Sequence, residues 1–197
     1  MTDTFKRLAI YCGSATPDDA RYLELAREVG RTLAERGIGV VYGGGKAGLM
    51  GAIAYAALDA GGEVIGVIPQ ALVDMEVANH DCTELHVVDT MHQRKQAFTD
   101  LSDGFVTLPG GVGTMDELWE AVSWAQLGYH QSPVGLLNAF GYYDGLIAFN
   151  REMADTGFVR DAHRNILIVG QTLEDLLEKM SNYKPIRTIV QMRAEDL

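Results

Sequence analysis

The sequence predicts an α/β fold on three observations. Short β-branched apolar runs alternate with longer stretches of helical period from one end of the chain to the other. Nearly all of these runs are apolar at every position, as strands covered on both faces must be. The 197 residues show no composition break, internal repeat or low-complexity tract. We therefore expect one Rossmann-like domain over residues 1–183, a doubly wound parallel sheet flanked by helices on both faces, with residues 184–197 as a C-terminal tail.

Each expected strand is a four- or five-residue apolar run. In chain order these runs are Leu8–Cys12, Gly39–Tyr42, Val64–Ile68, Leu85–Val88, Phe105–Leu108, Val134–Leu137 and Ile166–Val169. The expected helices lie between and after them, at Asp18–Arg36, Leu49–Ala60, Met91–Leu101, Met115–Leu127, Tyr143–Asp155 and Thr172–Met180. Gly37 is the expected C-cap of the first helix.

Two segments lack a clear period. Residues 70–83 carry several polar side chains, and we expect a loop or a short helix there, over one edge of the sheet. Long loops of this kind are often functional. The end of the chain, from residue 184, is mixed in charge and reads either as a tail or as a short strand that faces a partner.

Charge and cysteine usage exclude several function classes. Sixteen Lys and Arg against 27 Asp and Glu give a formal net charge of -11, which repels polyphosphate backbones, so we expect no nucleic-acid partner. No stretch approaches roughly 18 uninterrupted apolar residues and the N-terminus lacks a signal-peptide pattern, so we expect no membrane association. Cys12 and Cys82 have no metal-ligand or disulfide spacing. These features favour a cytoplasmic protein.

Small or glycine-rich turns follow three of the expected strands. They contain Gly13 and Ser14, then Gly43, Gly44 and Gly45, and then the run Gly110, Gly111, Val112, Gly113 and Thr114. Ligands of doubly wound sheets bind at the carboxyl ends of the strands, where glycine lets the backbone approach a phosphate. Two glycine turns suggest a phosphorylated small molecule. The alternative for each turn alone is a tight connection that needs positive φ.

Two familiar phosphate motifs do not fit. Gly43, Gly45 and Gly48 satisfy G-x-G-x-x-G, but the acidic residue about twenty positions on, Glu63, opens the next strand instead of closing it. A P-loop fails because Val40 and Ala47 replace its first glycine and its hydroxyl residue. Neither a dinucleotide nor a nucleoside triphosphate is favoured.

Charged residues are expected at the same edge. Thr114 precedes Glu117 by three residues, which is a capping-box pattern, although a carboxylate beside a phosphate turn also suits a catalytic or ligand-orienting role. Arg94 and Lys95 supply a planar fork and a point charge for phosphate or a purine edge, with a solvated basic pair as the alternative. His80, His86 and His92 recur every sixth residue, which matches no metal site, so none is expected.

These motifs resemble one family over nearly the whole chain. The runs Gly43–Gly51, Met91–Lys95 and Pro109–Glu117 resemble, in order and spacing, the LOG (LONELY GUY) family of cytokinin riboside 5′-monophosphate phosphoribohydrolases. Such proteins have often carried the label lysine decarboxylase, but Lys46 or Lys95 alone does not make a Schiff-base site. The resemblance implies hydrolysis of the N-glycosidic bond of N6-modified AMP, and of AMP itself, to free base and ribose 5-phosphate, without a cofactor.

The resemblance also implies roles for single residues. Arg94 and Glu117 match the catalytic pair of the family. The positions that match substrate contacts or belong to the same motifs are Glu76, Lys95, Gly110, Gly111, Val112, Gly113, Thr114, Met115, Asp116 and Ser123. Gly13, Ser14, Gly43, Gly44 and Gly45 are expected to form secondary phosphate or loop contacts. Ser123 stands where plant relatives often have Thr, and Asp116 replaces a common Glu.

The chemistry of bond cleavage agrees with the catalytic pair. Breaking a nucleosidic bond builds positive charge on the ribose, which the carboxylate of Glu117 can stabilise while it activates water. Arg94 can offset the charge of the departing purine or hold the sugar phosphate in register, and the sequence does not choose between these jobs.

Other readings stay open at this point. One is a general AMP nucleosidase without a cytokinin role, and another is a non-catalytic carrier of a nucleotide or the molybdenum cofactor. The resemblance implies a homodimer, for which the apolar helix with Trp119 and Trp124 is a candidate contact and core burial the alternative.

Overall fold

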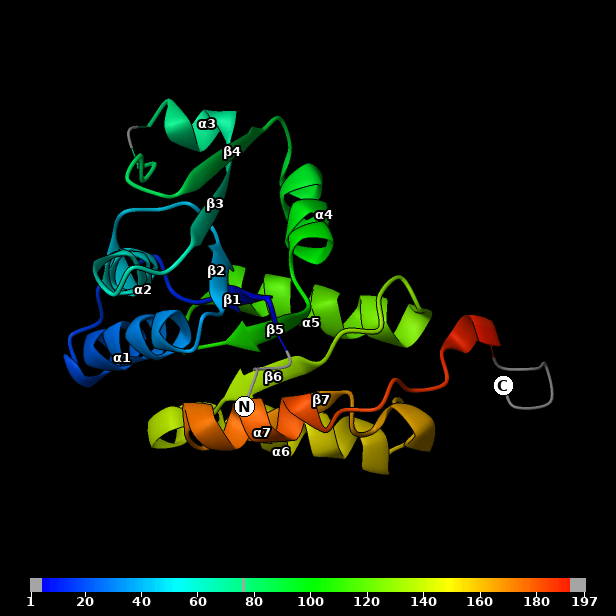
Figure 1. The fold of residues 1–197 in the computed structure, drawn as a ribbon. Helices are drawn as coiled ribbons and strands as arrows, with labels where there is room; N and C mark the ends of the chain where they lie inside the picture. Colours follow the sequence, from blue (N-terminus) through cyan, green and yellow to red (C-terminus); the bar gives the residue numbers. More distant parts are fainter. Residues whose placement is uncertain (1–4, 76, 192–197) are drawn as a thin grey trace.

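The computed structural model describes residues 5–75 and 77–191 (Figure 1). These residues contain seven strands, β1 (Arg7–Tyr11), β2 (Gly39–Tyr42), β3 (Val64–Pro69), β4 (Glu84–Val88), β5 (Gly104–Thr107), β6 (Val134–Leu137) and β7 (Leu167–Gly170). The α-helices are α1 (Arg21–Glu35), α2 (Gly48–Asp59), α3 (Gln70–Val73), α4 (Met91–Leu101), α5 (Val112–Leu127), α6 (Asp144–Asp155) and α7 (Leu173–Ser181). Short 3-10 turns occupy Ala139–Gly141, Asp161–His163 and Ile189–Gln191.

All seven strands form one parallel sheet in the order β4-β3-β2-β1-β5-β6-β7. The chain builds outward in one direction from β1 to β4, then crosses back to β5 beside β1 and continues the other way. The predicted doubly wound fold is therefore confirmed. The point where the order reverses lies between β1 and β5, and the crevice outside the carboxyl ends of those strands is where such sheets bind ligands.

Helices cover both faces of the sheet. On one face α1, α2 and α7 pack on a core that includes Leu33, Ile53 and Leu176. On the other face α4, α5 and α6 pack on a second core through Phe98, Leu118 and partly buried Leu146. In Figure 1, α4 stands across the direction of α5, and both helices belong to this second face. That crossing positions the candidate site.

The predicted elements are found with small boundary shifts. Gly39–Tyr42, Val134–Leu137 and Met91–Leu101 agree at both ends, and Gly37 follows α1 with φ +72°, as expected for a helix C-cap. The largest shifts are at the starts of two helices, because α1 begins three residues later than Asp18 and α5 three residues earlier than Met115. The edge strand β4 is only partly buried, with the Val87 side chain 47% exposed.

Residues 70–83 run over the edge of the sheet, as the sequence predicts. They begin with the short helix α3 and then return to the turn after β2, where Gly45 forms an antiparallel bridge with Ala78. The amide of Lys46 donates to the Val77 oxygen at 3.1 Å, and the amide of Asn79 donates to the Gly44 oxygen at 2.8 Å. This segment therefore forms one wall of the turn after β2.

The end of the described chain packs onto the domain. His163 lies with Nε2 3.0 Å from the Arg187 oxygen, and Thr188 is buried against Gly128 at the end of α5. Residues 184–191 hold a 3-10 turn and no strand, so the described part does not adopt the partner-facing strand considered above. Among the described residues, no helix is both long and apolar enough to cross a membrane.

Candidate active site

In the turn that leads from β5 into α5, packing does not require glycine at two of the glycine positions. A Cβ atom at Gly111 or Gly113 would meet no protein atom within 4 Å, and neither residue has positive φ. Val112 between them is 88% exposed. The alternative that this turn is glycine-rich because of positive φ is therefore wrong. The backbone at the start of α5 is open to approach by a ligand, and helix N-termini favour anions.

At Gly110, in contrast, the surrounding atoms leave no room for a side chain. A Cβ there would lie 2.1 Å from Thr114 Oγ1 and 2.8 Å from the amide nitrogen of Gly13. The Gly13 amide in turn donates to the Pro109 oxygen at 3.2 Å, so the turns after β1 and β5 touch. Thr114 is buried in the first turn of α5, while Ser14 is exposed. The two turns together form the crevice between β1 and β5.

The turn after β2 differs from that after β5. Gly44 and Gly48 have φ of +72° and +60°, so their backbone conformation favours glycine. A Cβ at Gly43 would lie 2.1 Å from Arg94 Nη2. This turn is glycine-rich because of its own geometry and because an arginine packs against it.

Arg94 and Glu117 form a buried ion pair. Arg94 Nη1 lies 3.4 Å from Glu117 Oε1, and each side chain is 7% exposed. The same guanidinium donates from Nε to the Val67 oxygen at 3.0 Å and from Nη2 to the Gly43 oxygen at 3.1 Å. Arg94 therefore links the carboxyl ends of β2 and β3 to the carboxylate on α5.

Burial raises the pKa of Glu117 to about 7. The positive charges of Arg94 and Lys95 act against this shift and lower the pKa. The neighbouring carboxylates of Asp116 and Glu120 add to the shift and raise the pKa. Near neutral pH this carboxyl group therefore populates both its protonated and its ionised form. Groups with such shifted pKa values are typical of catalytic sites.

The capping-box explanation of Glu117 is wrong. The N-cap of α5 is Gly111, so Thr114 lies inside the first turn and makes no cap hydrogen bond. A capping box occurs instead at α4, where Thr90 accepts from the Gln93 amide at 3.1 Å and Gln93 Oε1 accepts from the Thr90 amide at 3.1 Å. The pattern Thr-x-x-Gln was visible in the sequence and could have identified this cap, which fixes the start of the helix that carries Arg94.

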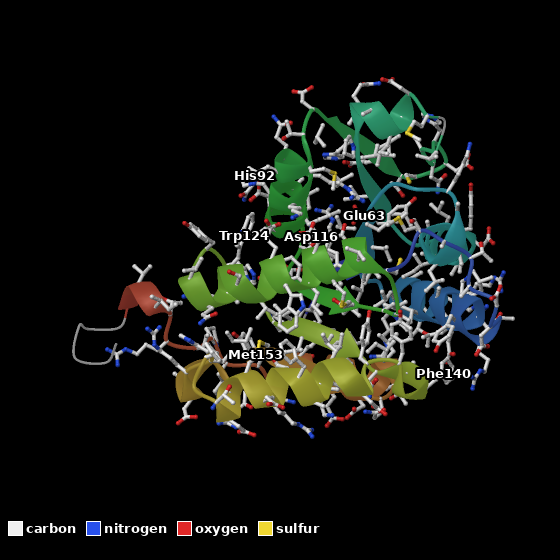
Figure 2. The ribbon with its side chains drawn as sticks, turned by 180° about the vertical axis from the view of Figure 1, so that it is seen from behind. Glu63, His92, Asp116, Trp124, Phe140 and Met153 are labelled. Carbon is white, nitrogen blue, oxygen red and sulfur yellow. The ribbon has the colours of Figure 1, made fainter. Side chains whose placement is uncertain are left out.

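Lys95 and Asp116 join the same cluster. Lys95 Nζ lies 2.9 Å from Asp116 Oδ2 and 3.3 Å from Glu120 Oε2, and its side chain is 15% exposed. Met115 packs partly buried against the core of this face. In Figure 2, Asp116 lies on α5 toward the side from which α4 approaches. The basic pair of α4 therefore faces carboxylates rather than solvent.

One expected contact, Ser123, lies away from this cluster, and a second, Glu76, is not described. Ser123 lies on the α6 side of α5 and lines a hollow of about 210 Å³ together with Trp119, Phe149 and Met153 (Figure 2 labels Met153). Glu76 lies outside the described residues, although its neighbour Val77 accepts the hydrogen bond from Lys46. Trp119 and Trp124 are half-buried, and Trp124 packs edge-on to His92 and Tyr129.

The sequence reasoning missed the contribution of the turn after β6. Tyr142 donates its hydroxyl to the Gly110 oxygen at 2.8 Å, and Tyr143 donates to the Leu108 oxygen at 2.7 Å. Tyr142 also lines an apolar hollow of about 200 Å³ in the crevice, with Gly13, Tyr22, Leu49 and Gly111. The signal was available, because every parallel strand must end at the same edge of the sheet.

Other potentially reactive groups lie outside this cluster. A wider groove of about 620 Å³ between α1 and α2 includes Lys46 but neither Arg94 nor Glu117. Cys12 is buried at the end of β1, and burial raises the pKa of its thiol. Glu63 precedes β3 and pairs with Arg7 at 2.6 Å, at the opposite ends of the strands, which confirms that it does not reach a ligand at this edge. No metal-binding cluster is found over residues 5–75 and 77–191.

Comparison with known proteins assigns the chain to a family. A family model described as "Possible lysine decarboxylase" matches residues 50–180. The cytokinin riboside 5′-monophosphate phosphoribohydrolase LOG of Oryza sativa subsp. japonica is 45% identical over 92% of this chain and 75% of its own length. The corresponding enzyme LOG1 of Arabidopsis thaliana is 42% identical over 92% of this chain and 85% of its own.

Solved structures show the same fold at lower identity. The molybdenum cofactor carrier protein of Chlamydomonas reinhardtii aligns with TM-score 0.67 and 20% identity over 89% of this chain and 96% of its own. The structure titled TM1055 aligns with TM-score 0.67 and 20% identity over 90% of this chain and 99% of its own. The structures show the fold alone, whereas the sequence matches show that the chain belongs to the LOG family, whose family model bears the description of a possible lysine decarboxylase.

Proposed function

We propose that this protein hydrolyses the N-glycosidic bond of nucleoside 5′-monophosphates whose base is an N6-modified adenine, and of AMP. The observation that carries the proposal is the buried Arg94–Glu117 pair, which lies one helical turn beyond an open glycine turn at the start of α5. The relatives named as cytokinin riboside 5′-monophosphate phosphoribohydrolases support a hydrolase of this type.

The start of α5 holds the 5′-phosphate in this proposal. Gly111 and Gly113 leave the backbone accessible, and the free amides and positive end of the helix favour a dianion. Because the whole chain carries a net charge of -11, local donors must supply the attraction. Phosphate binding remote from the reacting bond positions the sugar, which favours nucleotides over nucleosides.

The reaction joins water to the ribose and releases the base. The bond between the anomeric carbon and the purine nitrogen breaks, the water oxygen bonds to that carbon, and one proton of the water passes to the base. The ionised carboxylate of Glu117 stabilises the positive charge on the ribose and accepts the proton of the attacking water, and this proton then passes to the departing base. Arg94 is fixed by two backbone oxygens beside this carboxylate, so it offers a rigid cation either to the base or to the sugar phosphate. No cofactor takes part.

We also propose that the protein acts as a homodimer. The hollow between α5 and α6 is mainly apolar, and Phe149 at its rim is 59% exposed. An exposed apolar patch of this kind suits contact with a second copy. Phe149→Glu is expected to convert the dimer to a monomer in light scattering, and an unchanged mass would refute this interface.

The test of the reaction is release of free base from purified protein. Isopentenyladenosine 5′-monophosphate, AMP and the two nucleosides are compared by chromatography, with Glu117→Gln and Arg94→Ala as loss variants. Glu178→Gln, on the exposed side of α7, is the matched control for a carboxylate-to-amide change. We expect base from the monophosphates alone, lost in both variants and kept in the control.

The ratio of the two monophosphate rates separates cytokinin activation from general AMP turnover. If no substrate releases base while calorimetry still detects nucleotide binding, the hydrolase proposal fails and a carrier role takes its place.

A further inference from the structure

We propose that Glu120, which no motif singled out, is a positioning residue: with Asp116 it holds Lys95 in the charge cluster around Glu117 and thereby controls whether Glu117 is ionised. The inference rests on the proposed function for its meaning in catalysis. Its structural part, the control of one proton by neighbouring charges, is measurable without substrate.

The geometry places five charged side chains at the crossing of α4 and α5. Arg94 and Lys95 come from α4, and Asp116, Glu117 and Glu120 come from α5. Residues three or four apart lie on the same side of a helix, with Cβ atoms about 5–6 Å apart. Glu120 is therefore a neighbour of both Asp116 and Glu117, and Lys95 spans the first and the last of the three carboxylates.

Little solvent reaches this cluster. The side chains of Arg94 and Glu117 are each 7% exposed, that of Lys95 is 15% and that of Glu120 is 23% exposed, whereas Asp116 is 58% exposed. Charges this poorly hydrated act on one another more strongly than surface charges do. Glu120 is therefore the less solvent-exposed of the two carboxylates that pair with Lys95. Asp116, which is next to Glu117 in the chain, has the larger effect on the pKa of Glu117.

The charge count links the cluster to the proton of Glu117. Two cations face three carboxylates, so the cluster carries one negative charge when all groups are ionised, and none when Glu117 is protonated. Burial is the largest cause of the raised pKa of Glu117, and the other four groups of the cluster adjust it: Arg94 and Lys95 lower the pKa, while Asp116 and Glu120 raise it.

Two more titratable groups lie near Glu117, Tyr11 at the end of β1 and Cys12 directly after it, and both are neutral near neutral pH. Both side chains are buried, and burial raises the pKa of each above its usual value. They contribute no charge that competes with the cluster near neutral pH. A change at Glu120 or Lys95 is therefore expected to act on Glu117 without a compensating change on the strand side.

The two outer members of the cluster have opposite expected effects. Glu120→Gln removes a negative charge and favours the ionised form of Glu117, which moves its titration to lower pH. Lys95→Met removes a positive charge and moves the titration to higher pH. Each shift is expected to be on the order of one pH unit.

The experiment follows the side-chain carboxyl carbon of Glu117 by ¹³C NMR against pH, with glutamate labelling and Glu117→Gln to assign the signal. Asp175→Asn is the matched control, because Asp175 pairs with Lys179 at 2.8 Å on the opposite face of the sheet. We expect opposite shifts for Glu120→Gln and Lys95→Met and none for the control. Shifts in the same direction, or no shift, would overturn the inference.

A second variant and an activity measurement complete the test. Asp116→Asn is expected to move the titration in the same direction as Glu120→Gln, so the inference remains testable if Glu120→Gln folds poorly. The acid limb of the pH profile of kcat/KM should shift by the same amount as the Glu117 titration seen by NMR. A purely structural role of Glu120 would not produce this matching shift. If the NMR shifts occur but no monophosphate is cleaved, the proposed function fails and the charge cluster stands; if cleavage occurs with an unmoved limb, the inference fails.

Discussion

The turns after β2 and β5 look alike in the sequence, but their glycines have different physical causes. After β2, positive φ at Gly44 and the close approach of Arg94 to Gly43 leave no room for a side chain. After β5, Gly111 and Gly113 have neither constraint. The comparison teaches that a glycine without a structural cause is the better indicator of a ligand, and that a glycine with such a cause can instead make room for a neighbouring side chain.

The largest effect is expected from Gly43→Ala. The added methyl group would overlap Arg94 Nη2, so the guanidinium must leave its place beside Glu117. A displacement of about 1 Å costs about 100-fold in rate. Steady-state kinetics with isopentenyladenosine 5′-monophosphate measure this loss, and wild-type activity would mean that the β2 turn does not serve Arg94.

The proton on Glu117 is expected to affect stability as well as activity. Because the pKa of Glu117 is raised from 4.5 to about 7, the folded state holds this proton more tightly than the unfolded chain. The contribution is full below pH 4.5 and is lost as the pH rises to about 7, by about 3 kcal/mol. The free energy of unfolding of the wild type should fall by that amount relative to Glu117→Gln between these pH values in urea titrations.

The catalytic counterpart has the opposite direction. In the proposed reaction the ionised form of Glu117 is the active one, so kcat/KM is expected to fall as the pH drops through about 7. A flat profile between pH 6 and 8 would contradict the assignment of Glu117 as the group that accepts the proton.

A moderate effect is expected from Gly113→Ala, which separates the two turns most sharply. The methyl group meets no protein atom, and alanine inside α5 should raise the free energy of unfolding by about 0.5–1 kcal/mol. Crowding of the phosphate should raise KM for the monophosphates roughly tenfold, about 1.4 kcal/mol of binding. A variant that is more stable and binds as well as the wild type would show that this turn contacts no substrate.

The smallest effect is expected from Thr90→Ala. Loss of the capping box at α4 should cost about 1 kcal/mol of stability, measured by thermal unfolding. Arg94 is also held by two backbone oxygens, so it should stay in place when the cap is lost. Activity should therefore fall only a few-fold, which is less than the loss expected for Gly43→Ala. Thr99→Ala, in the same helix but away from its cap, is the control.

Much of this arrangement could be predicted from the sequence. The apolar runs predict the strand positions, and the parallel topology predicts that Arg94 and Glu117 lie at one edge of the sheet. The start of α5 could not be found in this way, because Gly111 and Val112 are poor markers of a helix and the Thr114–Glu117 pattern pointed to the wrong cap. The partners of Lys95 and the support from Tyr142 depend on how α4 and the β6 turn pack, which local patterns do not encode.

The hydrogen bonds of Arg94 have a consequence for how loss of activity would be recognised among related chains. Its side chain ties together the ends of β2 and β3, so selection for a stable fold would retain the arginine even after the substrate had been abandoned. Glu117 has the opposite effect on the fold, since a buried carboxyl group with a raised pKa lowers the free energy of unfolding at neutral pH. In a lineage that drifts away from catalysis, the glutamate should therefore disappear first, and its retention is the more informative sign of a working enzyme.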